Sequence, residues 1–140
     1  MQNSLVSIIM NCHNGEKYLS EAIKSIINQS YSNWEIIFWD NCSTDKSSLI
    51  IKSFNDLRIK YYKSSKFTNL GEARKLAFEK CAGEYVAFLD TDDIWFKEKL
   101  EKQLKYFEND VGIVTCNTIF FNEKMKEKLY KKKIQEGYIF

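Results

Sequence analysis

Two short apolar runs, "LVSIIMN" (residues 5–11) and "WEIIFWD" (34–40), constrain the fold of this chain more than any other feature. Neither run alternates between apolar and polar residues, as a strand with one solvent-facing side would. Runs of this kind are typical of parallel strands that are buried on both faces. Between the two runs, apolar side chains recur at the spacing of a buried helix face: Tyr18, Leu19, Ala22, Ile23, Ile26 and Ile27. The pattern predicts two parallel strands joined by a crossover helix, with Asn14 as the helix N-cap.

The same alternation continues along the chain. After the second strand we expect a helix capped by Ser43, whose apolar residues are Leu49, Ile50 and Phe54. Residues 58–62 form a short third strand, and Asn69 with Glu72 resembles the capping box of a helix that buries Ala73, Leu76 and Ala77. Gly83 suits the turn into a fourth strand over 85–89.

The carboxyl-terminal third is less regular. A helix is predicted from the spacing of Phe96, Leu100, Leu104 and Phe107, followed by a strand over 111–117. Beyond Asn122 the pattern indicates only a hairpin or a short helix. We therefore divide the chain into a domain over 1–122 and a lysine-rich segment over 123–140.

Alternating strands and helices place this chain in the α/β class. The expected architecture has three layers, α/β/α, around a mostly parallel sheet. In such sheets ligands bind outside the carboxyl ends of the strands, where the strand order switches direction. Polar residues gather at the predicted carboxyl ends, and we regard them as the candidate site: Asn11 to Asn14, Asp40 with Asn41, and Asp90 to Asp93.

The stretch "EYVAFLDTDDIW" (84–95) ends a buried strand in three carboxylates, Asp90, Asp92 and Asp93. Charges this close repel by roughly 4 kcal/mol per pair at an effective dielectric constant of about 20. A bound Mg²⁺ or Mn²⁺ would remove that repulsion, because these ions take a few carboxylate ligands and complete their shell with water and phosphate oxygens. Alternatively, Asp92 or Asp93 caps the next helix, which would account for one acid but not for three.

Phosphate recognition by a familiar loop is excluded, because the sequence has neither a Walker motif nor G-x-G-x-x-G. Helix N-termini at Asn14, Ser43 and Asn69 remain available for an anion. Arg74 is the best cation for a phosphate, or else a solvated helix residue. A receiver domain of two-component signalling also gathers acids at strand ends and is a rival interpretation. It is disfavoured, because it would need an acid pair after the first strand, where this chain has Asn11-Cys12-His13-Asn14.

Charge and cysteine content narrow the partners. Residues 123–133, "EKMKEKLYKKK", hold six lysines and two glutamates, which indicates a solvated face or peripheral contact with an anionic membrane surface. Nucleic acid is not expected, because Arg58 and Arg74 are the only arginines. Four dispersed cysteines without a C-x-x-C pair predict reduced thiols, as in a cytoplasmic protein. We expect the protein either in the cytoplasm or at the cytosolic face of the membrane.

Two longer segments resemble the amino-terminal half of family two glycosyltransferases with the GT-A fold. "SIIMNCHNGEKYLSEAIKSIINQSYSNWEIIFWDNCSTDKS" is similar to the opening strand–helix–strand of that family, and "NLGEARKLAFEKCAGEYVAFLDTDD" to its glycine–arginine helix and Asp-x-Asp strand. The resemblance runs from about Val6 to Asn117. It implies a nucleotide-diphospho-sugar donor, most often a UDP-sugar, bound together with Mg²⁺ or Mn²⁺.

By this resemblance Asn14 and Glu16 border the nucleoside, and Asp40 accepts a hydrogen bond from the uracil ring nitrogen. Asp92 is the main metal ligand, while Asp90 faces the ribose and sugar and also belongs to the metal site. The remaining expected donor-binding residues are Asn11, Cys12, His13, Asn41, Asn69, Gly71 and Arg74. His13 stands where the family usually has another aromatic residue, and it either stacks on the base or forms a passive wall.

The resemblance also implies the activity of a longer enzyme. We expect the donor-binding portion of an inverting, hexosyltransferase-type enzyme that acts on a glycan or lipid-linked acceptor. Its catalytic base, the acid that deprotonates the acceptor, is expected beyond residue 140, so the chain is interpreted as truncated and inactive alone. A non-catalytic nucleotide-sugar-binding module is the alternative. A nucleotidyltransferase is disfavoured, because "NCHNGEKYL" lacks the glycine- and lysine-rich loop that such an enzyme needs.

Overall fold

The computed structural model describes residues 4–107, 111–121 and 128–129. The chain forms two compact units that divide between Lys102 and Gln103. The first unit contains β1 (Val6–Cys12), α1 (Leu19–Ile27), β2 (Trp34–Asp40), α2 (Ser47–Ser53), β3 (Ile59–Lys63), α3 (Leu70–Phe78) and β4 (Tyr85–Phe88). Helix α4 (Lys99–Leu104) crosses the boundary, and the second unit contains β5 (Ile119–Phe120) and β6 (Lys128–Leu129).

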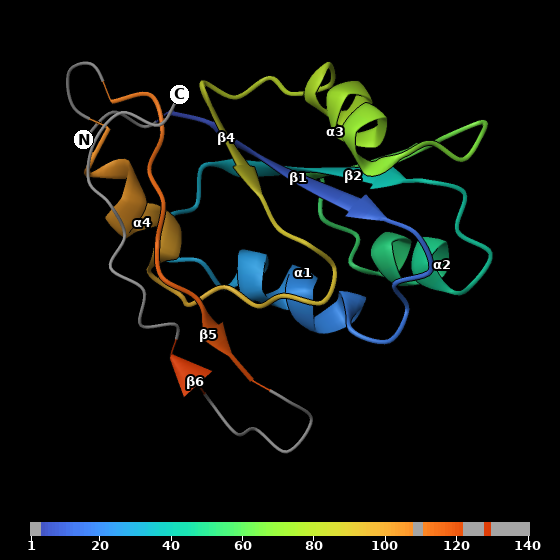
Figure 1. The fold of residues 1–140 in the computed structure, drawn as a ribbon, viewed down its shortest axis with the longest axis horizontal. Coiled ribbons are helices and arrows are strands. Elements are labelled where there is room, and N and C mark those ends of the chain that lie inside the picture. Colours follow the sequence, from blue (N-terminus) through green and yellow to red (C-terminus); the bar gives the residue numbers. More distant parts are fainter. Residues whose placement is uncertain (1–3, 108–110, 122–127, 130–140) are drawn as a thin grey trace. The chain divides into compact units, whose positions relative to one another are not determined.

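The four long strands form one parallel sheet in the order β3-β2-β1-β4, of which Figure 1 labels β2, β1 and β4. The chain moves from β1 outward through β2 to β3 and then returns to the other side of β1 for β4. The direction in which successive strands are added to the sheet therefore reverses between β1 and β4, although all the strands are parallel. In open α/β sheets, ligands bind at the carboxyl ends of the strands next to such a switch point. Both strands are followed by predicted site residues.

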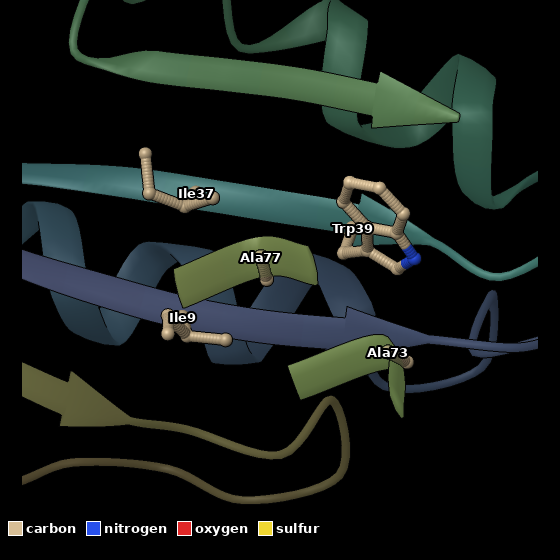
Figure 2. Close-up of a cluster of buried hydrophobic side chains, with 5 residues drawn as sticks. All are labelled: Ile9, Ile37, Trp39, Ala73 and Ala77. Atoms are coloured by element: carbon tan, nitrogen blue, oxygen red, sulfur yellow. The ribbon is translucent and has the colours of Figure 1, made fainter. Parts of the chain in front are cut away.

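Helices cover both faces of the sheet, with α3 on one face and α1 and α2 on the other (Figure 1). Under α3, a buried apolar cluster joins the helix to β1 and β2 (Figure 2): Ile9, Ile37, Trp39, Ala73 and Ala77. The apolar face of α1 is buried as its spacing predicted, through Leu19, Ala22, Ile23 and Ile26. The three-layer α/β/α fold expected from the sequence is confirmed.

A polar network lies on the α3 face near the amino ends of the strands. The carboxylate of Glu35, in β2, accepts hydrogen bonds from the Ser7 hydroxyl at 2.6 Å and the Ala82 amide at 2.8 Å, and it forms an ion pair with Lys60 at 2.6 Å. Burial alone would raise the pKa of Glu35, but these partners outweigh it, and the pKa is lowered. Gly83 enters β4 so close to β1 that a Cβ there would lie 2.6 Å from the carbonyl oxygen of Leu5, which explains the glycine.

Two predicted helix caps are wrong. Helix α1 begins at Leu19 after Tyr18, and Asn14 instead adopts a left-handed conformation with φ of 55° in the preceding loop. Helix α2 begins at Ser47 rather than after Ser43. The loop before α1 and the loop before α2 are hydrogen-bonded to each other, through Asn14 on one side and Ser43 and Thr44 on the other, so each helix begins later.

The other boundaries have mixed outcomes. Asn69 is the N-cap of α3, as predicted, and its Oδ1 accepts a hydrogen bond from the Glu72 amide at 2.9 Å. The strand predicted over 111–117 does not form, because no described strand pairs with these residues. Beyond Asn122, where the sequence indicates a hairpin or a short helix, the described residues Lys128–Leu129 (β6) pair antiparallel with β5, which lies before Asn122. The proposed domain boundary at residue 122, and the lysine-rich segment apart from Lys128–Leu129, lie outside the described residues.

Candidate functional site

The loops after β1 and β2 are hydrogen-bonded to one another at the carboxyl edge of the sheet. Oδ1 of Asn14 accepts a hydrogen bond from the Thr44 amide at 2.8 Å, and Oε2 of Glu16 accepts one from the Lys46 amide at 2.9 Å. In return, the Glu16 amide donates to Oδ2 of Asp45 at 2.9 Å. The side chains of Asn14 and Glu16 therefore position the β2–α2 loop, whatever else they contact.

Gly15 brings the β1–α1 loop against the turn that carries the acids. Its amide donates a hydrogen bond to the Ser47 hydroxyl at 3.0 Å, and a Cβ built on Gly15 would lie 3.0 Å from Oγ1 of Thr91. Thr91 stands between Asp90 and Asp92. The loop after β1 and the Asp-x-Asp turn after β4 are thus adjacent, as the switch point requires.

Asp40 is fully buried at the end of β2. Its Oδ1 accepts a hydrogen bond from the Ser43 amide, and its Oδ2 accepts one from the Tyr61 hydroxyl, both at 2.7 Å. Burial of the Tyr61 phenol, its hydrogen bond to Asp40 and the negative charge of Asp40 all raise the pKa of Tyr61. Each carboxylate oxygen can still accept a second hydrogen bond, but because Asp40 is fully buried, a base can reach it only if the surrounding groups move.

Asn41 is hydrogen-bonded to Thr68, in the segment that leads into α3. Its Oδ1 accepts a hydrogen bond from the Thr68 amide at 3.0 Å, and its Nδ2 donates to the Thr68 carbonyl at 2.7 Å. Thr68 directly precedes the N-cap Asn69, so Asn41 fixes where α3 begins. Gly71 lies exposed in the first turn of that helix.

An aromatic pair lies at the same edge. The His13 ring packs edge-on against Phe67 with 4.8 Å between ring centroids, and the Phe67 side chain is 62% exposed. Nδ1 of His13 lies 2.9 Å from the Asn41 carbonyl oxygen. Because a carbonyl can only accept, this nitrogen carries the proton, which fixes the orientation of the ring. Cys12 is buried beneath, and its Sγ accepts a hydrogen bond from the Ser43 hydroxyl.

Helix α3 is joined to the end of β4 by an ion pair. Nη2 of Arg74 lies 3.2 Å from Oδ1 of Asp90, and its guanidinium also lies over the Phe88 ring at 5.5 Å. Both side chains are partly exposed, so the pair stabilises the fold only slightly. Its consequence is positional, because it holds a cation of α3 and a carboxylate of the β4 turn together.

The three carboxylates of the β4 turn are exposed, and the Asp93 amide donates to the Asp90 carbonyl at 3.2 Å. Partial burial of the carboxyl group and repulsion from Asp92 and Asp90 raise the pKa of Asp93. Within the described part of the chain, no three His, Cys, Asp or Glu side chains already form a metal cage. The oxygen-only set of Asp90 and Asp92 nevertheless fits Mg²⁺ or Mn²⁺, which are bound through one or two carboxylates plus substrate phosphates rather than by the protein alone.

The structure thus joins the loops after β1 and β2, the turn after β4 and the start of α3, which together carry the sequence-predicted site residues. Sequence reasoning missed other residues that shape this edge, among them Gly15, Asp45, Tyr61, Phe67, Thr68 and Thr91. Of these, Gly15 carried a signal, as a glycine in the loop that follows a strand. Among the described helices, none is long and apolar enough to cross a membrane.

The sequence of this chain is similar to those of known glycosyltransferases. The sequence profile described as glycosyl transferase family 2 matches residues 7–139. The Escherichia coli UDP-Glc:alpha-D-GlcNAc-diphosphoundecaprenol beta-1,3-glucosyltransferase WfgD is 36% identical over 123 residues, which are 87% of this chain and 49% of WfgD. The chain thus spans about half the length of this relative.

Solved structures show the same fold. Staphylococcus aureus TarS 1–349 in complex with UDP-GlcNAc superimposes with a TM-score of 0.68 at 31% identity, over 71% of this chain and 30% of that one. The Pyrobaculum calidifontis mannosyltransferase PcManGT, solved with GDP-Man and Mn²⁺, has a TM-score of 0.70 at 21% identity over 75% of this chain and 32% of its own, a likeness of fold alone. The fold is of the GT-A type, and the chain belongs to glycosyl transferase family 2.

Proposed function

We propose that this chain is the donor-binding portion of an inverting, metal-assisted glycosyltransferase that takes its sugar from a UDP-sugar. The observation that carries the proposal is the meeting of three elements at the switch point: the β1–α1 loop at Gly15, helix α3 through Arg74, and the Asp90–Asp92 turn. The similarity to TarS, which was solved with UDP-GlcNAc, supports this choice of donor. The acceptor is a glycan or a lipid-linked saccharide, as the name of WfgD describes for that relative.

The acids, the aromatic pair and the loop residues at this edge contribute to donor binding in different ways. Asp92, with help from Asp90, would hold the Mg²⁺ or Mn²⁺, which would supply positive charge for the departing nucleoside diphosphate. Asp90, oriented by Arg74, faces the ribose and sugar. The exposed His13–Phe67 pair offers an aromatic surface for the base. Asn14, Glu16 and Asn41 keep the loops around the nucleoside in place.

Binding of UDP with and without metal tests this proposal. Two carboxylates would repel a diphosphate, so we expect calorimetry to show UDP binding in the presence of Mn²⁺ and a marked loss of affinity with a chelator. Asp92→Asn should abolish the metal dependence, and Asp93→Asn should reduce it less. Glu79→Gln, an exposed acid on the far end of α3, is the control and should behave as wild type. Equal affinity with and without metal would contradict the assignment of Asp92.

The alternative of a non-catalytic nucleotide-sugar-binding module predicts the same binding. The two differ in the longer protein: an enzyme turns over donor in the presence of acceptor, whereas a module does not. We place the protein in the cytoplasm, at the cytosolic face of the membrane when its acceptor is lipid-linked. Peripheral contact through the lysines of 123–133 would help there.

A further inference from the structure

Two buried nitrogen atoms near the site have hydrogens to donate and nothing to accept them. Among the described residues, the buried side-chain atoms without a hydrogen-bond partner are Nδ2 of Asn11 and Nε1 of Trp39. Trp39 is only 8% exposed. Buried polar groups are nearly always paired in native proteins, so an unpaired one calls for an explanation.

The two nitrogen atoms belong to neighbouring residues of the sheet. Asn11 and Trp39 are register partners in the parallel pair β1–β2. Partners on adjacent parallel strands point to the same face, and the strands lie about 4.8 Å apart. That face is the one covered by α3, because Trp39 packs in the cluster with Ala73. Figure 2 shows the indole nitrogen on the side of the ring that faces the carboxyl ends of the strands.

This position is within the proposed donor site. Asn11 lies two residues before His13, and Trp39 directly precedes Asp40. On the α3 side, Ala73 packs in the same cluster as Trp39 and is followed by Arg74. The ion pair of Arg74 with Asp90 joins α3 to the end of β4, the strand next to β1. The unpaired donors are therefore at the inner end of the edge where the nucleoside is expected.

We propose that Trp39 and Asn11 form a subsite for a carbonyl oxygen of the nucleotide base, an inference that rests on the proposed function. The indole N–H can only donate, so its missing partner must be an acceptor. A phosphate oxygen is unsuitable, because Trp39 is surrounded by Ile9, Ile37 and Ala73 and stacks near Tyr62, and burying a charge among apolar groups is costly. A neutral carbonyl fits such surroundings when it is hydrogen-bonded.

The subsite favours a base with carbonyl groups on its edge. Uracil presents two carbonyl oxygens, whereas cytosine replaces one of them with an amino donor that Trp39 cannot accept. Both nitrogen atoms are shielded from solvent, so the oxygen enters from the carboxyl edge by displacing a side chain there. The exposed Phe67 and the partly exposed Arg74 border that edge.

Nuclear magnetic resonance of the indole protons tests the contact in the whole chain without any mutation of the site. The protein has three tryptophans, Trp34, Trp39 and Trp95, and the Trp34→Phe and Trp95→Phe variants assign two of the three indole signals, which leaves the third to Trp39. With UDP and diamagnetic Mg²⁺, we expect the Trp39 indole proton to move downfield by more than those of Trp34 and Trp95. An unmoved Trp39 signal during saturable UDP binding would overturn the inference and would indicate an internal water as the partner.

Thio-substituted nucleotides give a second, independent measurement. Sulfur accepts hydrogen bonds poorly, so either 2-thio-UDP or 4-thio-UDP should bind the wild type about fivefold more weakly than UDP, the factor expected of one neutral hydrogen bond. Trp39→Phe, which keeps the ring, should bind UDP about as weakly and should no longer distinguish it from that analogue. Trp95→Phe is the matched control and should retain the preference for UDP.

The outcomes separate this inference from the proposed function. UDP binding with no discrimination among the three nucleotides would refute the subsite and leave the donor site intact. Absence of any UDP binding by the wild type would contradict the proposed function and the subsite together. If Trp39→Phe fails to fold, the wild-type indole shift and the thio series still decide the question.

Discussion

At the scale of single residues, the site depends on a buried charge. Asp40 is completely buried, and among the described residues its carboxylate accepts one hydrogen bond from the Ser43 amide and one from the Tyr61 hydroxyl. A buried carboxylate is tolerated only when its oxygens are well paired. Tyr61 therefore matters for the β2–α2 turn although it lies on the outermost strand, β3.

Replacing Tyr61 by Phe should lower the free energy of unfolding by about 1–3 kcal/mol, because one oxygen of a buried charged group loses its donor. Urea denaturation at neutral pH measures this change. Tyr62→Phe is the matched control: it removes a hydroxyl from the neighbouring residue, whose ring stacks on Trp39, and should have a smaller effect. Equal losses in both variants would show that the Tyr61–Asp40 bond contributes nothing specific.

Tyr61 should also make the protein sensitive to alkali. Its folded-state pKa is raised above 10.0, the usual value, so the folded state favours the neutral phenol. The contribution to stability is complete below the unfolded-state pKa and is lost as the pH rises past about 10 towards the folded-state pKa. Denaturation midpoints measured from neutral pH to about pH 11 should fall more steeply for the wild type than for Tyr61→Phe.

At the scale of elements, the position of α3 is set at its first residue. Asn69 caps the helix, and Asn41 holds the preceding Thr68. The register of this start determines where Arg74, one turn further, meets Asp90. A change at the cap can thus alter both the stability of the helix and the geometry of the site.

Asn69→Ala should cost about 1 kcal/mol of unfolding free energy, because the Glu72 amide loses its cap, whereas Asn69→Ser should restore most of it. Measuring UDP affinity on the same variants separates two roles. If Asn69 contacts the nucleotide, as the sequence predicts, the serine variant regains stability but not affinity. Recovery of both would indicate that Asn69 acts only through the helix.

The Glu35 network should make the sheet sensitive to acid. The pKa of Glu35 is lowered from 4.5, so its stabilising effect is complete above that value and is lost as the pH falls below it. Glu35→Gln should be less stable than wild type at pH 7, because Lys60 loses its partner, and should lose less stability between about pH 5 and pH 3. Urea denaturation across that range is the measurement, with Glu79→Gln on the surface as a control.

At the scale of the whole molecule, we propose that the described residues supply the donor side of a transferase. The chain spans about half the length of WfgD. Among the described acids of the site, Asp40 is hydrogen-bonded to Tyr61 and Asp90 is paired with Arg74. Asp92, the proposed metal ligand, and Asp93 lie with Asp90 on the β4 turn. We expect the catalytic base of the transfer to belong to the longer protein.

The 140-residue chain should therefore bind UDP with metal and transfer no sugar. A coupled assay with UDP-sugar and a lipid-linked acceptor should detect at most slow donor hydrolysis. The positive control is a full-length family member under the same conditions. Robust acceptor-dependent turnover by the purified chain would contradict this expectation and would require a base among its own residues.

Much of this organisation is predictable from the sequence alone. Continuous apolar runs and helical spacing are local properties, so they identified the order and type of the main elements, the cap at Asn69 and the tight turn at Gly83. The same runs placed the polar residues at strand ends, and the family resemblance, now confirmed, extended that to a GT-A fold. The roles of the individual site residues stay predictions.

Other features depended on contacts between segments far apart in the chain. Asn14 and Ser43 look like helix caps locally, yet in the fold the loops that contain them bond to each other, because parallel strands β1 and β2 bring the two loops together. Asp40 reads as an open ligand group, but Tyr61 from β3 and the Ser43 amide close around it. The unpaired donors of Asn11 and Trp39 exist only because register pairs the two residues under α3. Which side chains meet across strands and loops, and which polar atoms burial leaves unpaired, are set by the packing of the whole sheet, which no local pattern encodes.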